Sequence, residues 1–275
     1  MSYNEDILNL QLDDRRWSRC IKELEGYLGR ELVNFDDEYK QISNSCENEE
    51  DLLYNSQSAV EVSSYYTRTK KYLFELLRWE ATYDKQENFK RIQIFLRKNR
   101  LNRILDFGGG IGGLTLYLKA RNFECDYADI AGETFKFAQY RFLKRKNSIK
   151  SFDLLQGWPK DNYYNAVCAY DVLEHLPALD KKIEKLSLLL GKGGYLISKS
   201  TFSGGGLHLK ENEQYLDFSR FNKLLDGFGL QYTGRIKDSY STQFFKGIGM
   251  HNILGIRIRK DAKTGGCFLL HQKIK

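Results

Sequence analysis

Hydrophobic residues recur at two different spacings along the chain, and the spacing changes near Arg103. Before that point they recur every three or four residues over 65–79 and 89–96, which predicts helices. An earlier helix is predicted at 17–28, and the polar, acidic stretch 36–51 is expected to link it to the helix at 65–79. After Arg103, short apolar runs alternate with helical patterns. The predicted strands are 104–107, 125–130, 149–152, 165–170, 195–202 and 229–237, and the predicted helices between them are 114–118, 134–146, 177–189 and 211–228.

This alternation predicts an α/β fold, because strands that alternate with helices at this spacing build βαβ units around a mostly parallel sheet. The tail differs, since extended runs at 256–259 and 267–274 flank a polar turn at 260–266. Such a pair is compatible with a hairpin and equally with a strand that closes an antiparallel edge.

Length and composition then narrow the class of protein. The chain has 275 residues with 41% hydrophobic side chains and two prolines, which is typical of a globular protein. We expect a core domain at 101–275 and a helical extension at 1–100. No apolar run approaches the roughly 18 residues of a membrane helix, and the acidic start of the chain does not resemble a secretory signal. The five cysteines include no C-x-x-C pair, which favours reduced thiols and a cytoplasmic location.

Charge is unevenly distributed along the chain. Residues 1–62 hold 15 acidic and 6 basic side chains, whereas residues 63–275 hold 37 basic and 21 acidic ones. This split is compatible with an acidic segment that pairs with a basic body, and equally with two solvated ends. A basic body also fits an anionic partner such as RNA, although a lysine-rich genome gives the same excess.

Candidate chemistry begins with a glycine-rich loop at 106–112, Asp-Phe-Gly-Gly-Gly-Ile-Gly, between a predicted strand and a predicted helix. Glycines there allow a tight turn and a close approach of a ligand to the backbone. Gly108, Gly110 and Gly113 also satisfy the dinucleotide pattern G-x-G-x-x-G. Asp106 favours a ligand that carries an ammonium group, because a carboxylate would repel a pyrophosphate. A glycine turn that binds nothing is the alternative.

Two more carboxylates follow the next predicted strands. Asp129 ends the second strand, where a carboxylate can accept both hydroxyls of a ribose. Its alternative is a helix-capping role before Ala131 and Gly132. Asp153 follows the weak strand 149–152 and could accept the exocyclic amine of an adenine, or be an ordinary loop aspartate.

Taken together, these segments resemble the class I S-adenosylmethionine-dependent methyltransferases. The resemblance covers about residues 101–236, and the ordered set of motifs is more specific than any one of them. The segments that carry it are Ile-Leu-Asp-Phe-Gly-Gly-Gly-Ile-Gly at 104–112, Tyr-Ala-Asp-Ile at 127–130, Asn-Ala-Val-Cys-Ala-Tyr-Asp-Val-Leu-Glu-His-Leu at 165–176 and Leu-Gly-Lys-Gly-Gly-Tyr-Leu-Ile at 190–197.

The resemblance implies a Rossmann-like seven-stranded sheet that binds S-adenosylmethionine, preceded here by a helical extension. It implies that Asp106, Gly108 and Gly110 hold the methionine end of the cofactor. Asp129 and Ile130 would lie at the ribose and Asp153 at the adenine. Tyr170 and Asp171 would line the methionine and acceptor side, with Tyr170 counted in both the cofactor and the acceptor site.

The acceptor is expected to be a small molecule that is methylated on oxygen or nitrogen. A hydroxyl acceptor needs a base, and His208 is the candidate because it follows a flexible loop beyond the fifth predicted strand, with Glu211 near it in sequence. A surface-loop histidine is its alternative, and His175 is expected to be structural. With Tyr170 and Asp171, His208 completes the predicted catalytic set.

Three alternatives stay open at this point. Asp171, Glu174 and His175 offer donors at helical spacing, and with His208 they resemble the metal site of some RNA 2′-O-methyltransferases and quinone-pathway enzymes. Many relatives with similar residues bind no metal, so we expect none. RNA methylation is not favoured, because no Asn/Asp-Pro-Pro-aromatic motif follows the fourth strand and no RNA-binding module is attached. A non-catalytic binding subunit is the third alternative, and outside the methyltransferases an NAD-dependent dehydrogenase, which would bind a nicotinamide cofactor instead, is a further one.

Overall fold

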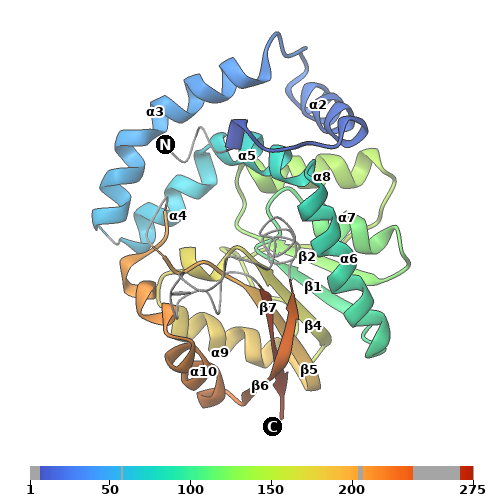
Figure 1. Cartoon of the computed structure of the whole chain (residues 1–275), viewed down its shortest axis with the longest axis vertical. Coiled ribbons are helices and arrows are strands. Elements are labelled where there is room, and N and C mark those ends of the chain that lie inside the picture. Colours follow the sequence, from blue (N-terminus) through green and yellow to red (C-terminus); the bar gives the residue numbers. More distant parts are fainter. Residues whose placement is uncertain (1–6, 57, 204–206, 238–266, 275) are drawn as a thin grey trace, which may run out of the picture. The chain divides into compact units, whose positions relative to one another are not determined.

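Seven strands form one mixed sheet in the computed structural model, which describes residues 7–56, 58–203, 207–237 and 267–274. The strand order is β3-β2-β1-β4-β5-β7-β6 (Figure 1). β1 pairs with β4, β4 with β5, and β2 with β3 in parallel, whereas β7 is antiparallel to both β5 and β6. The strands are β1 Arg103–Phe107, β2 Glu124–Asp129, β3 Ser151–Asp153, β4 Tyr164–Tyr170, β5 Leu190–Lys199, β6 Leu230–Lys237 and β7 Cys267–Lys273. The predicted seven-stranded Rossmann-like sheet is therefore confirmed.

The chain divides into two compact units. The first comprises residues 1–86, 108–158 and 205–207, and the second comprises 87–107, 159–204 and 208–275. β2 and β3 belong to the first unit, and the other five strands belong to the second.

In the second unit, helices cover both faces of the strands. α6 (Tyr83–Lys98, in this unit from Glu87) lies on one side (Figure 1). Its Phe95 packs edge-on against Tyr195 of β5. α9 (Leu179–Leu189) and α10 (Phe218–Gly227) lie on the other side. There Lys273 of β7 donates to the Ser187 carbonyl. Strands covered on both faces are largely apolar, as the run Ala-Val-Cys-Ala at 166–169 of β4 shows.

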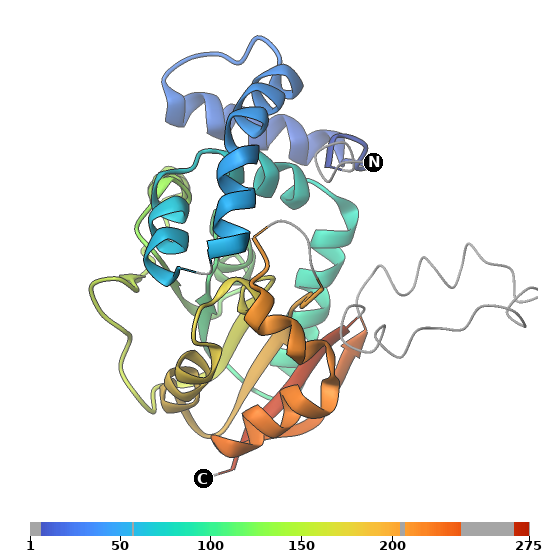
Figure 2. The same cartoon turned by 90° about the vertical axis from the view of Figure 1, so that its left-hand side faces the viewer.

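β7 corrects the expectation for the tail. It is antiparallel, as predicted, but it lies between β5 and β6 rather than at an edge. Residues 267–271 are all buried, and an uninterrupted buried run suits an internal strand. Figure 2 shows α10 beside β6 and β7, where Phe221 meets the ring of His271. The predicted run 256–259 and its turn lie outside the described residues.

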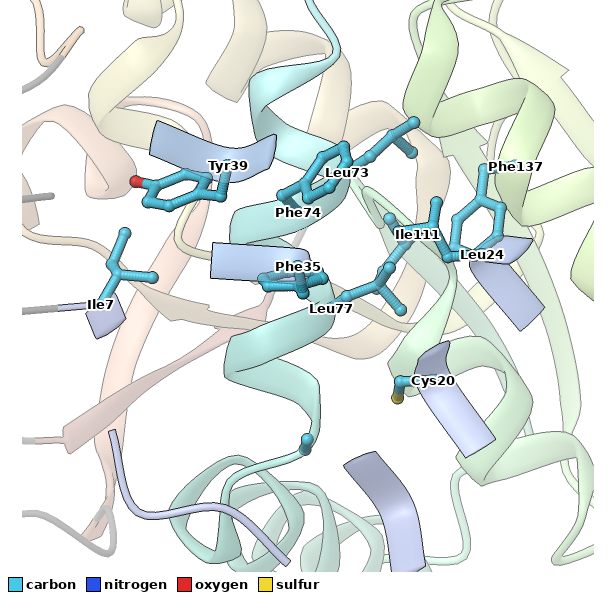
Figure 3. Close-up of a cluster of buried hydrophobic side chains, with 11 residues drawn as sticks. Ile7, Cys20, Leu24, Phe35, Tyr39, Leu73, Phe74, Leu77, Ile111 and Phe137 are labelled. Carbon is cyan, nitrogen blue, oxygen red and sulfur yellow. The ribbon is translucent and has the colours of Figure 1, made fainter. Parts of the chain in front are cut away.

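The first unit is largely helical, and some of its helices share one apolar core. The helices are α2 Asp14–Leu28, α3 Phe35–Ser56, α4 Ala59–Arg68, α5 Lys71–Glu80, α7 Gly113–Lys119 and α8 Glu133–Lys144. Side chains from α2, α3, α5 and α8 meet Ile111 of the glycine loop in this core (Figure 3). The buried members are Ile7, Cys20, Leu24, Phe35, Tyr39, Leu73, Phe74, Leu77, Ala81, Ile111 and Phe137.

α3 shows that the linker predicted at 36–51 was wrong, because this stretch is helical. Its start is favourable, since the Asn34 side chain accepts from the backbone N–H of Asp36 and Asp37. The acidic residues of the first turn are stabilised there by the helix dipole. Phe35 and Tyr39, four residues apart, are buried in the core. The predicted helix at 211–228 is also refined, because residues 210–216 form a 3-10 helix, η2, before α10 begins.

Ion pairs within the first unit favour the first of the two alternatives for the uneven charge, because some acidic residues of 1–62 pair with basic residues later in the chain. Within the first unit, Glu50 contacts Lys71 at 2.6 Å, and Glu23 contacts both Arg141 and Arg145 of α8. Asp36–Arg78 and Glu49–Arg68 are further pairs of this kind.

Candidate functional site

The glycine loop in the first unit adopts a backbone that glycine is best able to take. Gly108, Gly110 and Gly112 have φ of 64°, 55° and 74°, and Gly112 caps the start of α7. A Cβ on Gly112 would also lie 2.6 Å from the Phe142 ring. The loop is fixed to β2, since the Gly108 N–H donates to the Ala128 carbonyl at 2.8 Å. The expected tight turn between strand and helix is present.

Asp129 is the residue that holds this loop in place. Its Oδ2 accepts from the Gly110 N–H and its Oδ1 from the Ile130 N–H, both at 2.7 Å. The cap of α8 is Gly132, without a side-chain bond, so the helix-capping alternative for Asp129 is wrong. A carboxylate accepts up to four hydrogen bonds, so these two backbone bonds are compatible with ribose hydroxyl donors.

Asp153 lies beside Asp129 in the sheet, because the two residues are in register between β2 and β3. Its Oδ1 accepts from the backbone N–H groups of Ala131 and Leu155, each at 3.0 Å. Gly110, Asp129, Ile130 and Asp153, four of the predicted cofactor residues, are therefore brought together through their backbone and carboxylate contacts.

Arg141 supports the loop from behind and was missed by the sequence analysis. The side chain is fully buried, and its Nη1 donates to the Ile111 carbonyl at 2.6 Å. It also bonds the carboxylates of Glu23 and Glu80. Burial alone would lower the pKa of Arg141, but these two carboxylates raise it above its ordinary value. The sequence feature that could have identified Arg141 as buried is its position on the apolar face of α8, four residues after Phe137.

In the second unit, Asp106 is buried in β1 with 3% of its surface exposed, and it is in register with Cys168 of β4. Burial, followed by the charge of Asp106, raises the pKa of the Cys168 thiol well above its ordinary value. A thiol held protonated in this way is a poor nucleophile. The sequence analysis likewise gave Cys168 no catalytic role.

Tyr170 and Asp171 stand where β4 ends. The Tyr170 hydroxyl accepts from Nδ2 of Asn88, and its ring is edge-on to Phe268. Asp171 is exposed and has a φ of 54°. A positive φ is uncommon for residues other than glycine, and the residues that have one are frequent at functional sites. Its N–H donates to the Lys199 carbonyl at 2.8 Å. Asn88, a completely buried amide on α6, was not found from the sequence because single polar residues in helices are common.

His208 is brought together with two residues of the segment after β4. The rings of His175 and His208 are edge-to-face with centroids 4.8 Å apart. Donor atoms of Glu174, His175 and His208 all lie within 4.8 Å of one another, and Asp171 is not part of this group. Glu211, the expected neighbour of His208, instead accepts from the Ala178 N–H at 3.0 Å.

Comparison with known proteins adds three findings. A family model described as a methyltransferase domain matches residues 79–230. A solved S-adenosylmethionine-dependent methyltransferase from Clostridium acetobutylicum is 14% identical, with 70% of this chain and 93% of that chain covered and a TM-score of 0.50. Magnesium protoporphyrin IX methyltransferase from Synechocystis, solved with bound S-adenosylmethionine, is 17% identical, with 74% and 83% covered and a TM-score of 0.47. At these identities the likeness concerns the fold alone.

Two further searches gave negative results. The sequence matches no curated protein. Among the described residues, no helix combines the length and apolar character needed to span a bilayer.

Proposed function

The chain belongs to the S-adenosylmethionine-dependent methyltransferases, the methyltransferase-domain family that its residues 79–230 match, and from this premise we propose that it methylates an oxygen or nitrogen atom of a small molecule. The single observation that carries the proposal is the bonding of Asp129 to the glycine loop. It places a carboxylate beside a backbone turn of the kind that a nucleoside can approach closely.

The donor groups fit S-adenosylmethionine, which supplies an activated methyl group on a sulfonium. We propose that Asp129 and Ile130 bind the ribose and that Asp153 lies at the adenine. Asp106, Gly108, Gly110 and Tyr170 complete the proposed cofactor site. Carboxylates after three successive strands suit this ligand, since its sulfonium and ammonium groups are cationic and its hydroxyls and amine donate hydrogen bonds.

On the acceptor side, we propose that Tyr170, Asp171 and His208 orient the nucleophile. Transfer forms a bond from the acceptor atom to the methyl carbon, while the carbon–sulfur bond breaks and its electron pair stays on sulfur. The acceptor must lose one proton, and the role that we propose for His208 is to accept it or to orient the acceptor while the proton leaves. The remaining task is alignment of the two reactants without water.

The class of acceptor is inferred from the residues at the end of β4. Residues 170–173 are Tyr-Asp-Val-Leu, which lack the Pro-Pro-aromatic motif of enzymes that methylate base amino groups. We therefore propose a small-molecule acceptor, with the helical residues 1–100 contributing to its selection. The five cysteines are free thiols, which supports a reducing compartment such as the cytoplasm.

The test is transfer of label from methyl-tritiated S-adenosylmethionine. The purified full chain is incubated with a metabolite extract below about 3 kDa in one arm and with total RNA in the other. We expect label in the small-molecule fraction, and less of it with the Asp129→Ala variant when the cofactor is below saturation.

Two results would overturn this proposal. Label in RNA, together with RNA affinity that falls steeply with salt, would establish the RNA methyltransferase alternative. Binding of S-adenosylmethionine without transfer to either fraction would favour the non-catalytic alternative. Glu124→Ala, which removes an exposed carboxylate at the start of β2, is the matched control for charge.

A further inference from the structure

We propose that Glu174, His175 and His208 bind one divalent transition-metal ion, such as Zn²⁺ or Mn²⁺, beside the acceptor. All three residues belong to the second unit, and their donor atoms lie within 4.8 Å of one another. Side-chain rotation can shorten such a spacing to that of ligands sharing an ion. The binding of the ion stands on its own geometry, while its part in methyl transfer rests on the proposed function.

Glu174 gives the first independent observation. Its side chain is buried, with 2% of the residue exposed, and its Oε1 accepts from the Thr201 N–H at 2.9 Å. Among the residues that the structure describes, Oε2 of Glu174 has no hydrogen-bond partner. A buried carboxylate oxygen is costly unless it is paired or coordinates a metal. A cation beside the two imidazoles would satisfy it.

The orientation of His208 gives the second observation. Its Nδ1 lies 2.6 Å from the Ser203 carbonyl oxygen. A carbonyl only accepts, so Nδ1 must carry the proton and the lone pair of the neutral ring is on Nε2. Metal-binding histidines are commonly fixed in this way, with one ring nitrogen donating to a carbonyl and the other facing the ion.

The backbone around the three donors is tied together by one buried amide. Nδ2 of Asn212 donates to the carbonyls of Leu173, Glu174 and Leu176, at distances of 3.4, 3.3 and 2.9 Å. The Leu209 N–H also donates to the Glu174 carbonyl at 3.0 Å. Asn212 thereby joins the 3-10 helix η1, Leu173–His175, to the segment that carries His208. The donors are positioned before any ion arrives, which is what a high-affinity site requires.

Two imidazoles and one carboxylate select the kind of metal. Mg²⁺ and Ca²⁺ prefer oxygen ligands, whereas imidazole nitrogen suits Zn²⁺ and other transition ions. Three protein ligands leave coordination positions open for a substrate atom. The acceptor atom is then an oxygen. An ion held by these residues would lower the pKa of a coordinated acceptor hydroxyl, whose proton would pass to solvent.

The experiment measures ion binding without any methyl acceptor. The untagged full chain is freed of metal with a chelator, and Zn²⁺ or Mn²⁺ is added in a calorimeter. Binding of Co²⁺ is followed in parallel by its visible absorption, which strengthens when the ion leaves its octahedral water shell for a protein site of lower coordination number. We expect one ion per chain, and at least about tenfold weaker binding for Glu174→Gln and for His208→Ala. Glu184→Gln, an exposed carboxylate on α9, is the matched control and should bind as the unmodified chain does.

The inference would be overturned if the chelated protein took up no ion with one-site stoichiometry, or if all three variants bound equally. His208 is only half-buried, so its variant should stay folded even if Glu174→Gln does not. The proposed function is judged separately. If transfer to a small molecule persists in excess chelator, the metal has no part in catalysis and the proposed methyltransferase function stands. If the chain binds the ion but transfers no methyl group, the metal site stands and the proposed function is overturned.

Discussion

Replacing Arg141 by methionine should destabilise the first unit strongly. The side chain is fully buried and contacts Glu23 at 3.0 Å, Glu80 and the carbonyl of Ile111. Its loss leaves Glu80, whose side chain is only 13% exposed, without the cation that it pairs with, while Glu23, 10% exposed, keeps only Arg145. Breaking a buried ion pair by removing one partner costs about 3–5 kcal/mol. We expect a loss of this size in the free energy of unfolding.

The assay is urea unfolding near pH 7.5, followed by tryptophan fluorescence. Arg145→Met is the matched control, because Arg145 lies one turn further along α8, is 29% exposed and bonds Glu23 alone. A partly exposed pair contributes about 1 kcal/mol or less. Adding Glu80→Leu to Arg141→Met should recover part of the loss, since one stranded carboxylate is removed with it.

The same variant should weaken S-adenosylmethionine binding, because the Ile111 carbonyl loses its anchor and the glycine loop becomes less ordered. The reasoning about Arg141 would be refuted if Arg141→Met cost no more stability than Arg145→Met. An unchanged cofactor affinity would show that Arg141 supports the fold without positioning the loop.

Three further variants probe other parts of the molecule. His208→Ala should lower kcat far more than S-adenosylmethionine affinity, and steady-state kinetics with parallel calorimetry would show otherwise if both fell equally. Gly112→Ala should lose about 1–3 kcal/mol of stability from its φ of 74° and its contact with Phe142, measurable as a lower urea midpoint; an unchanged midpoint would contradict this. Burial lowers the pKa of His271 in the folded chain to about 4. As pH falls below about 6.5, His271 of the unfolded chain is therefore protonated while that of the folded chain is still neutral. Stability should therefore fall by roughly 3 kcal/mol between pH 7 and 4, and His271→Gln should flatten that part of the urea-unfolding profile, whereas an equal slope would exclude His271 as its cause.

The parallel part of the sheet could be predicted because its strands are buried on both faces and end at glycine or aspartate. β1 illustrates this, since its apolar run stops at the glycine loop. β7 has the same uninterrupted apolar character, yet its place between β5 and β6 depends on contacts distant in sequence. Periodicity could show that β7 is a strand, but not which neighbours it pairs with.

The missed features share a physical cause, which is that charged residues usually lie at the surface. The stretch 36–51 of α3 looked like a linker because its acidic residues outnumber the apolar ones, although Phe35 and Tyr39 carried the helical spacing. Arg141 looked like one more surface arginine of α8. The bonds of Asp129 to the glycine loop depend on how close two segments lie in the fold. The sequence therefore could not decide between ribose binding and helix capping for Asp129.

Calorimetric titration of S-adenosylmethionine tests the central claim about Asp129 most directly. We predict one cofactor per chain and an affinity that Asp129→Ala weakens by about 1–3 kcal/mol, the cost of leaving buried polar partners unmet. Glu124→Ala should bind normally. Asp129→Ala should weaken the binding of an analogue that lacks both ribose hydroxyls less than it weakens that of S-adenosylmethionine, because only the contact of Asp129 with the glycine loop is then lost. Equal affinity of both proteins for S-adenosylmethionine itself would contradict the assignment of the ribose to Asp129.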